Sequence, residues 1–328
     1  MSGLTLVTGA AGFIGSNLAR MLAEEGSDVV ACDWFGHGAQ WTYLADVRLH
    51  DVIRPEHLSD WLAGDGRDVE TIIHMGAISA TTETDVDRIV ALNIRATLDL
   101  WRAATERAAT FIYASSAATY GDGASGFQDN DSEAGLARLR PLNAYGWSKQ
   151  VADRRFAHDA ATGRPTPPKW AGLKFFNVYG PNEAHKQGMR SVVHQIYPLA
   201  ARGETVSLFK SDNPAYGDGG QLRDFIYVKD ICAIVRSMLA APRLSGIYNA
   251  GTGQARSFED LAKAVFAAVG RPAAISYRDM PSALKGKYQY FTEADVSKLR
   301  ADGLAPNFHD LEDGVADYVR HLALEFGA

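Results

Sequence analysis

Tyr145, Lys149 and Ser116 are the residues of this chain whose types and spacing best suit the chemistry of an alcohol. A tyrosine and a lysine four positions apart on a helix share one face. Because a nearby ammonium group favours the phenolate, we expect Lys149 to lower the pKa of Tyr145, which suits proton exchange near neutral pH. Ser116 closes an expected strand at its carboxyl end, where the sites of open α/β sheets lie. The Tyr-x-x-x-Lys spacing alone is common, so the rest of the chain decides whether this pair is catalytic.

A glycine-rich turn near the N-terminus is typical of a dinucleotide site. It reads TGAAGFIG and stands between an expected strand and an expected helix, the context that gives a Gly-x-x-Gly-x-x-Gly pattern its meaning. Gly9 permits the tight turn, and Gly12 lets backbone N–H groups approach a pyrophosphate at the helix N-terminus. Gly15 lets helix and strand pack closely. Phe13 and Ile14 complete the predicted cofactor turn.

The second expected strand ends in Asp33, which influences the choice of cofactor. A carboxylate there can bind the ribose hydroxyls of NAD, whereas it would repel the 2′-phosphate of NADP. The next residues, WFGHGAQWTYL, hold no lysine or arginine, so His37 is their only potential cation. Trp34, Asp46 and Val47 are further candidates for the cofactor site, although a surface cap is the alternative for Asp46. This segment therefore favours NAD.

The elements that must position these residues follow an alternating pattern. Short apolar runs alternate with longer amphipathic ones, as in a parallel sheet with crossover helices. The main expected strands are residues 4–9, 28–33, 71–77, 110–116 and 172–180. Beyond about residue 180 we expect long loops, strands at 204–209 and 246–251, a helix capped by Ser257, and a closing helix at 308–326.

This pattern predicts an α/β fold with a Rossmann-type doubly wound parallel sheet and a smaller, irregular α/β substrate domain. The dinucleotide-binding domain is predicted to span residues 1–178 plus about 222–250. The substrate domain then takes about 179–221 and 251–328.

Composition excludes several classes of function. The 328 residues carry a formal net charge of −6, and their lysines and arginines are scattered, which argues against a nucleic-acid partner. Cys32 and Cys232 lie in apolar runs and read as buried thiols, with neither a disulfide framework nor a metal cluster. No apolar stretch approaches the length of a membrane span, and no basic segment precedes the first strand. We therefore expect a cytoplasmic protein without a membrane partner.

Longer segments carry a more specific resemblance. They are YASSAATYG, PLNAYGWSK, FFNVYGPNEAHKQGM, RDFIYVKD, SGIYNAGTGQARSF and LKGKYQYFTEADVSKLR. Together with the glycine turn they resemble the extended short-chain dehydrogenase/reductase family, in its nucleotide-sugar epimerase branch, over essentially the whole chain. The resemblance implies a homo-oligomeric enzyme that holds one nicotinamide cofactor tightly in each subunit and acts on a nucleotide sugar.

The activity that the resemblance implies is inversion of C6″ in an ADP-linked heptose, a precursor of lipopolysaccharide. A transient 6″-ketone would turn about the C5″–C6″ bond before it is reduced on its other face. Because the oxygen moves, two proton-transfer residues are needed, and the resemblance assigns them to Tyr145 and Lys186. Lys186 lies in the polar segment NEAHKQGMR, where a solvated loop lysine is the alternative.

Further site residues carry over from the family by position. The cofactor site adds Met75, Gly76, Ala77, Ile78, Ser79, Asn93 and Val178, with Tyr145, Lys149 and Lys186 beside them. Ser116 also belongs to the substrate site, which adds Asn177, Gly188, Gln195, Phe209, Lys210, Ser211, Asp212, Arg223 and Tyr288. Lys149 would hold the nicotinamide ribose, and Arg223 would grip the substrate pyrophosphate.

The sequence departs from the family pattern at three points. The family usually binds NADP through a lysine where this chain has Gln40, so Gln40 and Asp33 together favour NAD. Gln195 replaces a histidine that contacts substrate, with His194 one position earlier. The loop before Arg223 is longer than usual. The last two differences leave a modified sugar or a different nucleotide open.

Two other classes of function compete with this interpretation. A UDP-hexose 4-epimerase would share Ser116, Tyr145 and Lys149 but would not need Lys186, and a dehydratase of this branch would carry Asp-Glu where Ala117 and Ala118 stand. A non-enzymatic dinucleotide sensor would keep the glycine turn without a reason to retain the tyrosine, the serine and both lysines.

Overall fold

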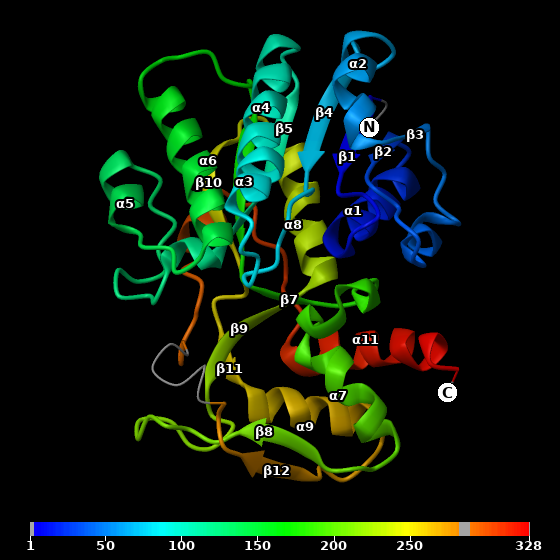
Figure 1. Cartoon of the computed structure of the whole chain (residues 1–328), viewed down its shortest axis with the longest axis vertical. Helices are drawn as coiled ribbons and strands as arrows, with labels where there is room; N and C mark the ends of the chain where they lie inside the picture. Colours follow the sequence, from blue (N-terminus) through cyan, green and yellow to red (C-terminus); the bar gives the residue numbers. More distant parts are fainter. Residues whose placement is uncertain (1–2, 282–288, 328) are drawn as a thin grey trace.

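A seven-stranded parallel sheet forms the centre of the molecule (Figure 1). The computed structural model describes residues 3–281 and 289–327. The strand order is β10-β6-β5-β4-β1-β2-β3, with all neighbours parallel. The strands are β1 (Leu4–Thr8), β2 (Asp28–Cys32), β3 (Asp51–Ile53), β4 (Val69–His74), β5 (Thr110–Ser116), β6 (Trp170–Phe175) and β10 (Ser245–Ala250). The order reverses between β1 and β4, so the carboxyl ends of these two strands form the crevice in which doubly wound sheets bind ligands.

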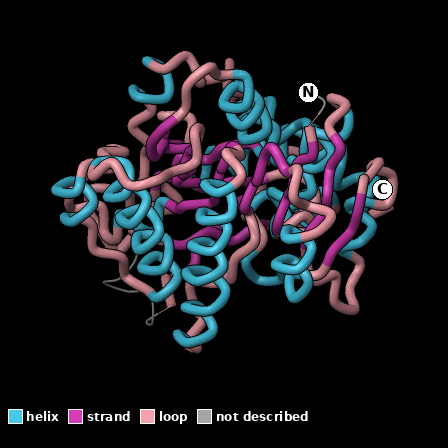
Figure 2. Tube along the Cα trace, turned by 90° about the horizontal axis from the view of Figure 1, so that it is seen from above, coloured by secondary structure: helices cyan, strands magenta, loops and turns pink. Residues whose placement is uncertain are grey.

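Helices cover both faces of this sheet, which confirms the predicted doubly wound fold (Figure 2). They are α1 (Phe13–Glu24), α2 (Leu58–Ala63), α3 (Val86–Ile89), α4 (Ala96–Glu106), α5 (Glu133–Arg138), α6 (Ala144–Ala161) and α8 (Val228–Ala240). Short 3₁₀ segments are η1 (Gln40–Leu44), η2 (Pro55–His57) and η4 (Ala117–Tyr120), while η3 (Val90–Arg95) is a π-helix. Trp101 of α4 stacks on Phe156 of α6 with ring centroids 3.9 Å apart, so these two helices share one aromatic core.

The single strand predicted at residues 172–180 is wrong, because the chain leaves the large sheet in its middle. Phe176 is buried, and its backbone N–H bonds to the carbonyl of Ala250 at 3.1 Å. The N–H of Val178 then bonds to the carbonyl of Phe176 at 2.9 Å, which bends the backbone. Beyond this bend β7 (Asn177–Tyr179) joins a second, three-stranded sheet.

A second layer of structure lies beyond the carboxyl ends of the large sheet (Figure 1). Its three-stranded sheet has the order β11-β9-β7, with β9 (Leu222–Tyr227) and β11 (Ala255–Ser257), and a two-stranded sheet pairs β8 (Val206–Phe209) with β12 (Ile275–Arg278). The remaining helical segments are η5 (Ala184–Met189), α7 (Val192–Ala201), α9 (Phe258–Ala268), α10 (Ser297–Ala301) and α11 (Leu311–Glu325). Ser257 and Asp260 form the capping box of α9. The predicted division into two domains stays a prediction.

The cysteines and the apolar segments agree with the expectations from composition. Cys32 and Cys232 are buried thiols. Over residues 3–281 and 289–327, no helix has the length and apolarity that a membrane span requires.

Candidate active site

The glycine turn packs so tightly that side chains are excluded from two of its positions. Gly9 has φ +67°, and a Cβ there would lie 2.6 Å from the backbone N of Gly76. A Cβ on Gly15 would lie 2.0 Å from the carbonyl oxygen of Gly9. Gly12 is the N-cap of α1, and its N–H bonds to Gly9 O at 3.0 Å. The turn therefore brings the start of α1 against the loop after β4.

Asp33 joins the end of β2 to this turn. Its carboxylate accepts hydrogen bonds from the backbone N–H of Ala11 at 2.8 Å and of Trp34 at 2.7 Å. Burial raises the pKa of Asp33, and its backbone hydrogen bonds oppose that shift. Gln40 approaches the same turn, with its Nε2 3.5 Å from the carbonyl oxygen of Ala11.

The neighbouring candidates in this segment face elsewhere. Asp46 is exposed and forms a bidentate ion pair with Arg20 of α1, with N···O distances of 2.6 and 3.0 Å. The indole N–H of Trp34 bonds to Glu56 at 2.9 Å, and Val47 packs against the main core. Arg20 leaves no local signal in the sequence, because it pairs with a residue 26 positions later.

Residues 75–79 are held between the glycine turn and α6. Asn93, in the π-helix η3, brackets Ile78 by accepting from its N–H at 2.8 Å and donating to its carbonyl at 2.9 Å. The same amide bonds to Ser148 of α6 at 3.1 Å. π-Helical turns are frequent at functional sites, and this one presents Asn93 to both elements. Met75, Gly76, Ala77 and Ile78 are half-buried here, and Ser79 is exposed.

A buried chain of hydrogen bonds at the end of β4 supports the loop formed by residues 75–79. His74 contacts the hydroxyl of Thr8 through Nδ1 at 2.6 Å and the hydroxyl of Thr97 through Nε2 at 2.8 Å. The Thr8 hydroxyl also accepts from the N–H of Gly76 at 3.2 Å. The sequence analysis missed this chain, although a lone polar residue that ends an apolar strand is a usable signal.

Acid is expected to destabilise the protein through His74. Burial, followed by the charge of Lys149, lowers the pKa of His74 from 6.5 to about 3. Between these values the unfolded chain binds a proton that the folded chain does not, so the free energy of unfolding falls as the pH drops through this range. In His74→Gln this part of the pH dependence should vanish, as denaturant unfolding from about pH 3 to 7 would measure. An unchanged slope would contradict the assignment.

The structure brings Ser116, Tyr145 and Lys149 together where β5 ends and α6 begins. Asn143 caps α6 by accepting from the N–H of Gly146 at 2.8 Å. A Cβ on Gly146 would lie 2.7 Å from the carbonyl oxygen of Ala118, so α6 starts in close contact with the turn after Ser116. The Nζ of Lys149 lies 5.9 Å from the centre of the Tyr145 ring.

The predicted lowering of the Tyr145 pKa by Lys149 is wrong for the chain as it stands. Burial raises the pKa of Tyr145, with the Ser116 hydroxyl acting in the opposite direction. Burial also lowers the pKa of Lys149 to about 8, against the charge of Asp153. Both shifts have one cause, because a buried site penalises the phenolate and the ammonium alike.

A buried ion pair lies beneath these groups. Asp153 of α6 and Lys174 of β6 are 0% and 1% exposed, and their charged atoms lie 2.6 Å apart. Asp153 also accepts from the hydroxyls of Tyr113 at 2.9 Å and Ser115 at 2.8 Å. The sequence analysis missed this pair, although a lysine within the apolar run of β6 and a carboxylate one turn after Lys149 were visible signals.

Lys186 is half-buried against the glycine turn rather than solvated. Its Nζ lies 5.2 Å from the centre of the Phe13 ring at the start of α1. The same loop bonds to α1 through Asn182 and Ser16 at 3.0 Å, and through Asn17 and the carbonyl of Pro181 at 3.0 Å. Burial lowers the pKa of Lys186, and the charge of Glu183 opposes this shift.

The substrate candidates lie mostly in the second layer. β7 pairs with β9 so that Asn177 faces Phe225, two positions from Arg223. Arg223 is 8% exposed, donates to the carbonyls of Leu222 at 2.8 Å and Gln289, and covers the Phe258 ring. These contacts hold the arginine within the second layer.

The remaining candidates are more dispersed. Phe209 ends β8, Lys210 pairs with Asp279 at 3.0 Å, and the N–H of Asp212 bonds to the Tyr290 hydroxyl at 3.0 Å. The N–H of Ser211 bonds to Asp218 at 2.9 Å. Gln195 is exposed on α7 and bonds to the carbonyl of Arg190 at 2.6 Å, while Gly188 is exposed and Val178 half-buried. Tyr288 lies outside the described residues.

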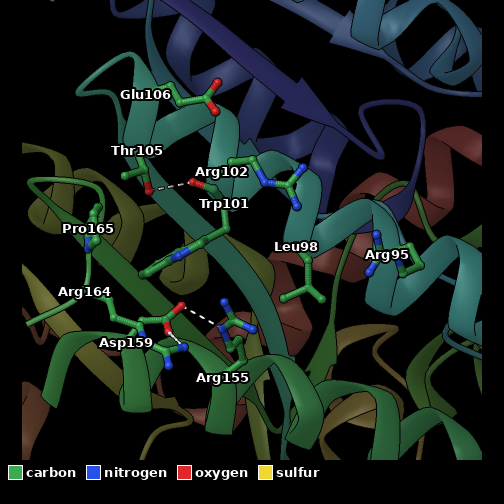
Figure 3. A pocket seen from close by; sticks show the side chains of 10 residues that line it. All are labelled: Arg95, Leu98, Trp101, Arg102, Thr105, Glu106, Arg155, Asp159, Arg164 and Pro165. Carbon is green, nitrogen blue, oxygen red and sulfur yellow. Dashed lines mark hydrogen bonds and ion pairs between the residues drawn. The ribbon is translucent and has the colours of Figure 1, made fainter. Parts of the chain in front are cut away.

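Two surface hollows lie away from the predicted catalytic side chains. The first, of about 380 Å³, lies between α4, α6 and the loop before β6 and shares no residue with the predicted site (Figure 3). Its buried Asp159 binds both Arg155 at 2.8 Å and Arg164 at 3.4 Å, so these two guanidinium groups already have a carboxylate partner. The second, of about 350 Å³, includes Asn213 and Tyr216 and adjoins the predicted substrate loop.

Known proteins resemble this chain along its whole length. A model of the NAD dependent epimerase/dehydratase family matches residues 5–251. Proteins named ADP-L-glycero-D-manno-heptose-6-epimerase are 46% identical over 318 residues in Nitratidesulfovibrio vulgaris (96% of each chain) and 44% identical over 333 residues in Fusobacterium nucleatum (98% of this chain, 99% of the other). The crystal structure of the Helicobacter pylori protein of that name superposes with a TM-score of 0.79 at 29% identity, covering 98% of this chain and 96% of the other.

Proposed function

Because the chain belongs to the NAD dependent epimerase/dehydratase family, we propose that it interconverts ADP-D-glycero-β-D-manno-heptose and ADP-L-glycero-β-D-manno-heptose. The reaction inverts C6″ through a transient 6″-ketone, without net oxidation, so the protein is an isomerase. Relatives at 44–46% identity over nearly the full chain support this substrate. In bacteria that build lipopolysaccharide, the product is a heptose precursor.

The residues present fit a nicotinamide dinucleotide. Gly12 is the N-cap of α1 and carries no side chain, so backbone N–H groups at the start of this helix can meet a pyrophosphate directly, while Gly9 and Gly15 allow the turn to pack against the neighbouring backbone. Asp33 stands at the end of β2, where a ribose is held in this fold. When bound, the nicotinamide supplies the acceptor and donor of the C6″ hydride, while the protein orients the sugar and moves protons.

One observation carries the 6-epimerase assignment: Lys186 is half-buried against Phe13 at the glycine turn, in a loop separate from the Tyr145 cluster. C6″ is exocyclic, so its oxygen changes position when the ketone turns. Tyr145, assisted by Ser116, serves one position, and Lys186 serves the other. Each must come within roughly 2.6–3.2 Å of the oxygen that it serves.

Holding a charged ammonium group in a buried position costs free energy. This cost suits a lysine that must both give and take a proton. Burial lowers the pKa of Lys186 from its ordinary value and so brings it closer to the working pH. Lys149 is better placed to hold the ribose of the cofactor beside Tyr145, because it lies next to the ring and is 3% exposed. Homo-oligomeric assembly and a cytoplasmic location stay predictions.

We expect the protein to prefer NAD to NADP. The Asp33 carboxylate would repel a 2′-phosphate, and Gln40 offers no charge to compensate. Gln40→Lys should therefore tighten NADP binding by about tenfold, the value of one charge-assisted hydrogen bond. Titration of both cofactors into protein freed of its own cofactor measures this preference, with Gln254→Lys as the control at an exposed glutamine elsewhere. Equal gains in the two variants would contradict it.

A panel of nucleotide sugars tests the function itself. ADP-D-glycero-β-D-manno-heptose should be converted, whereas UDP-glucose and UDP-N-acetylglucosamine should remain unchanged under the same conditions. Turnover of the UDP-hexoses alone would instead identify a 4-epimerase, the alternative that shares Ser116, Tyr145 and Lys149.

A further inference from the structure

Glu183 carries a fully buried carboxylate three residues before Lys186, and the mechanism above does not use it. Its exposed fraction is 0%. The backbone N–H of Ser191 donates to one oxygen at 2.5 Å, and the Ser191 hydroxyl donates to the other. A buried carboxylate is costly unless it is well bonded, so a role for this one is worth seeking.

These bonds close the loop that carries Lys186. Glu183 stands at the start of the loop, and Ser191 at its end is the N-cap of α7, where its hydroxyl accepts from the N–H of His194 at 3.4 Å. The N–H of Lys186 bonds back to the carbonyl of Glu183 at 3.0 Å. One carboxylate therefore ties both ends of the segment, and Lys186 lies between them.

Tyr318 of the C-terminal helix α11 lies within the electrostatic influence of the same carboxylate. Burial, followed by the charge of Glu183, raises the pKa of the Tyr318 phenol in α11. Tyr318 is fully buried in the apolar core of the second layer. The position of the loop is set by the bonds of Glu183 to Ser191 at the start of α7 and by the bond between Asn182 and Ser16 of α1.

The backbone next to Lys186 is strained, which indicates that surrounding contacts hold the loop in this conformation. Gln187 has φ 49° and ψ −121°, and Asn182 has φ 74°. A non-glycine residue in such a conformation is destabilised and persists only where surrounding contacts fix it. The Glu183–Ser191 bonds are contacts of this kind.

The negative charge of Glu183 also acts on the ammonium group of Lys186. It opposes the effect of burial on Lys186, whereas His185 in the same loop is the other titratable neighbour and has its own pKa lowered by burial and by Lys186. From η1, Tyr43 packs against His185 with ring centroids 5.7 Å apart. The residues of α1 that meet the loop, Phe13, Ser16 and Asn17, are uncharged.

We propose that Glu183 is a positioning residue for Lys186: it fixes the loop that presents the ammonium group to the substrate. This inference rests on the proposed role of Lys186 as the second proton-transfer residue. This positioning role accounts together for the buried carboxylate, the strained loop and the proximity of α11.

Glu183→Gln separates this role from a merely structural one. Removing the negative charge lowers the pKa of Lys186, so the limb of the kcat/KM pH profile that Lys186 sets should move to lower pH by about one unit. The rate of epimerisation should fall about tenfold or more. The partial reaction in which Tyr145 removes the proton, followed by the absorbance of the reduced nicotinamide, should remain near its original rate. Glu204→Gln, at an exposed glutamate bonded to Arg202, is the control.

Ser191→Ala provides a second variant that keeps the charge but removes the hydroxyl that donates to Glu183 and caps α7. It should slow epimerisation without moving the pH limb, and it serves as the test of positioning if Glu183→Gln does not fold. If Lys186→Met abolishes epimerisation while Glu183→Gln keeps the original rate and pH profile, this inference is overturned and the proposed function stands. If Lys186→Met epimerises normally, the proposed role of Lys186 fails first.

Discussion

Tyr145→Phe is expected to reduce epimerisation by about a thousandfold while the protein keeps its fold and its cofactor. General acid–base groups contribute about 10²–10⁴-fold to such reactions. The phenol is the group best placed to take the proton of the 6″-hydroxyl, because it lies beside Ser116 at the carboxyl end of β5, with Lys149 next to the ring. Ser116 alone cannot replace it, since an aliphatic hydroxyl is too weak an acid to exchange protons near neutral pH.

The structure offers a matched control for this variant. Tyr277 lies in β12 with its side chain 37% exposed, so Tyr277→Phe removes a phenol elsewhere in the molecule. Initial rates of both proteins, together with the amount of nicotinamide released on denaturation, compare activity with cofactor content. Normal epimerisation by Tyr145→Phe, or equal loss of cofactor and activity, would contradict the catalytic role.

Lys186→Met should reduce epimerisation by about 10²–10⁴-fold, the range for one proton-transfer group, with far less effect on cofactor binding. Methionine keeps most of the apolar length that packs over Phe13 but carries no proton. The ketone formed through Tyr145 could then be reduced only from the face on which it arose. Oxidation and return to the starting epimer should therefore continue, while inversion stops.

An isotope experiment distinguishes inversion from return. With substrate deuterated at C6″, the Lys186→Met protein should still move deuterium to and from its nicotinamide but should produce almost none of the other epimer. Lys263→Met, at an exposed lysine of α9 that pairs with Glu259, is the control. Parallel losses of deuterium transfer and inversion would mean that Lys186 serves binding instead.

Much of the large sheet could be predicted because its strands are continuous apolar runs. The expected strands at 4–9, 28–33 and 110–116 correspond to β1, β2 and β5, each within one residue. β3 was missed since it spans only three residues, and the bend at Phe176 was missed because it depends on a bond to Ala250, far along the chain.

The site residues were not all predicted equally well, because some of their properties depend on contacts between segments that lie far apart in the sequence. The glycine turn and the Tyr145–Lys149 pair lie within short segments, so their spacing, taken together with the elements around them, indicated them. The burial of Lys186 arises from Phe13 and from contacts with α1, more than 160 positions away, such as that between Asn182 and Ser16. A polar loop of this composition reads as solvated until those contacts are known.

Electrostatics was the least predictable property. Proximity alone indicated that Lys149 would lower the pKa of Tyr145, but burial of the whole cluster raises it instead. The buried Asp153–Lys174 pair beneath the cluster likewise depends on how α6 packs on β6. Such effects follow from desolvation, which a sequence reports only indirectly.

One experiment tests the central claim most directly. The purified protein, with no cofactor added, is incubated in D₂O with ADP-D-glycero-β-D-manno-heptose, and C6″ is followed by NMR. The account predicts a mixture of both epimers in which C6″ keeps its original hydrogen, because hydride passes to a resident nicotinamide and returns without exchange with solvent. Deuterium at C6″, or no conversion by protein that holds its nicotinamide, would contradict it.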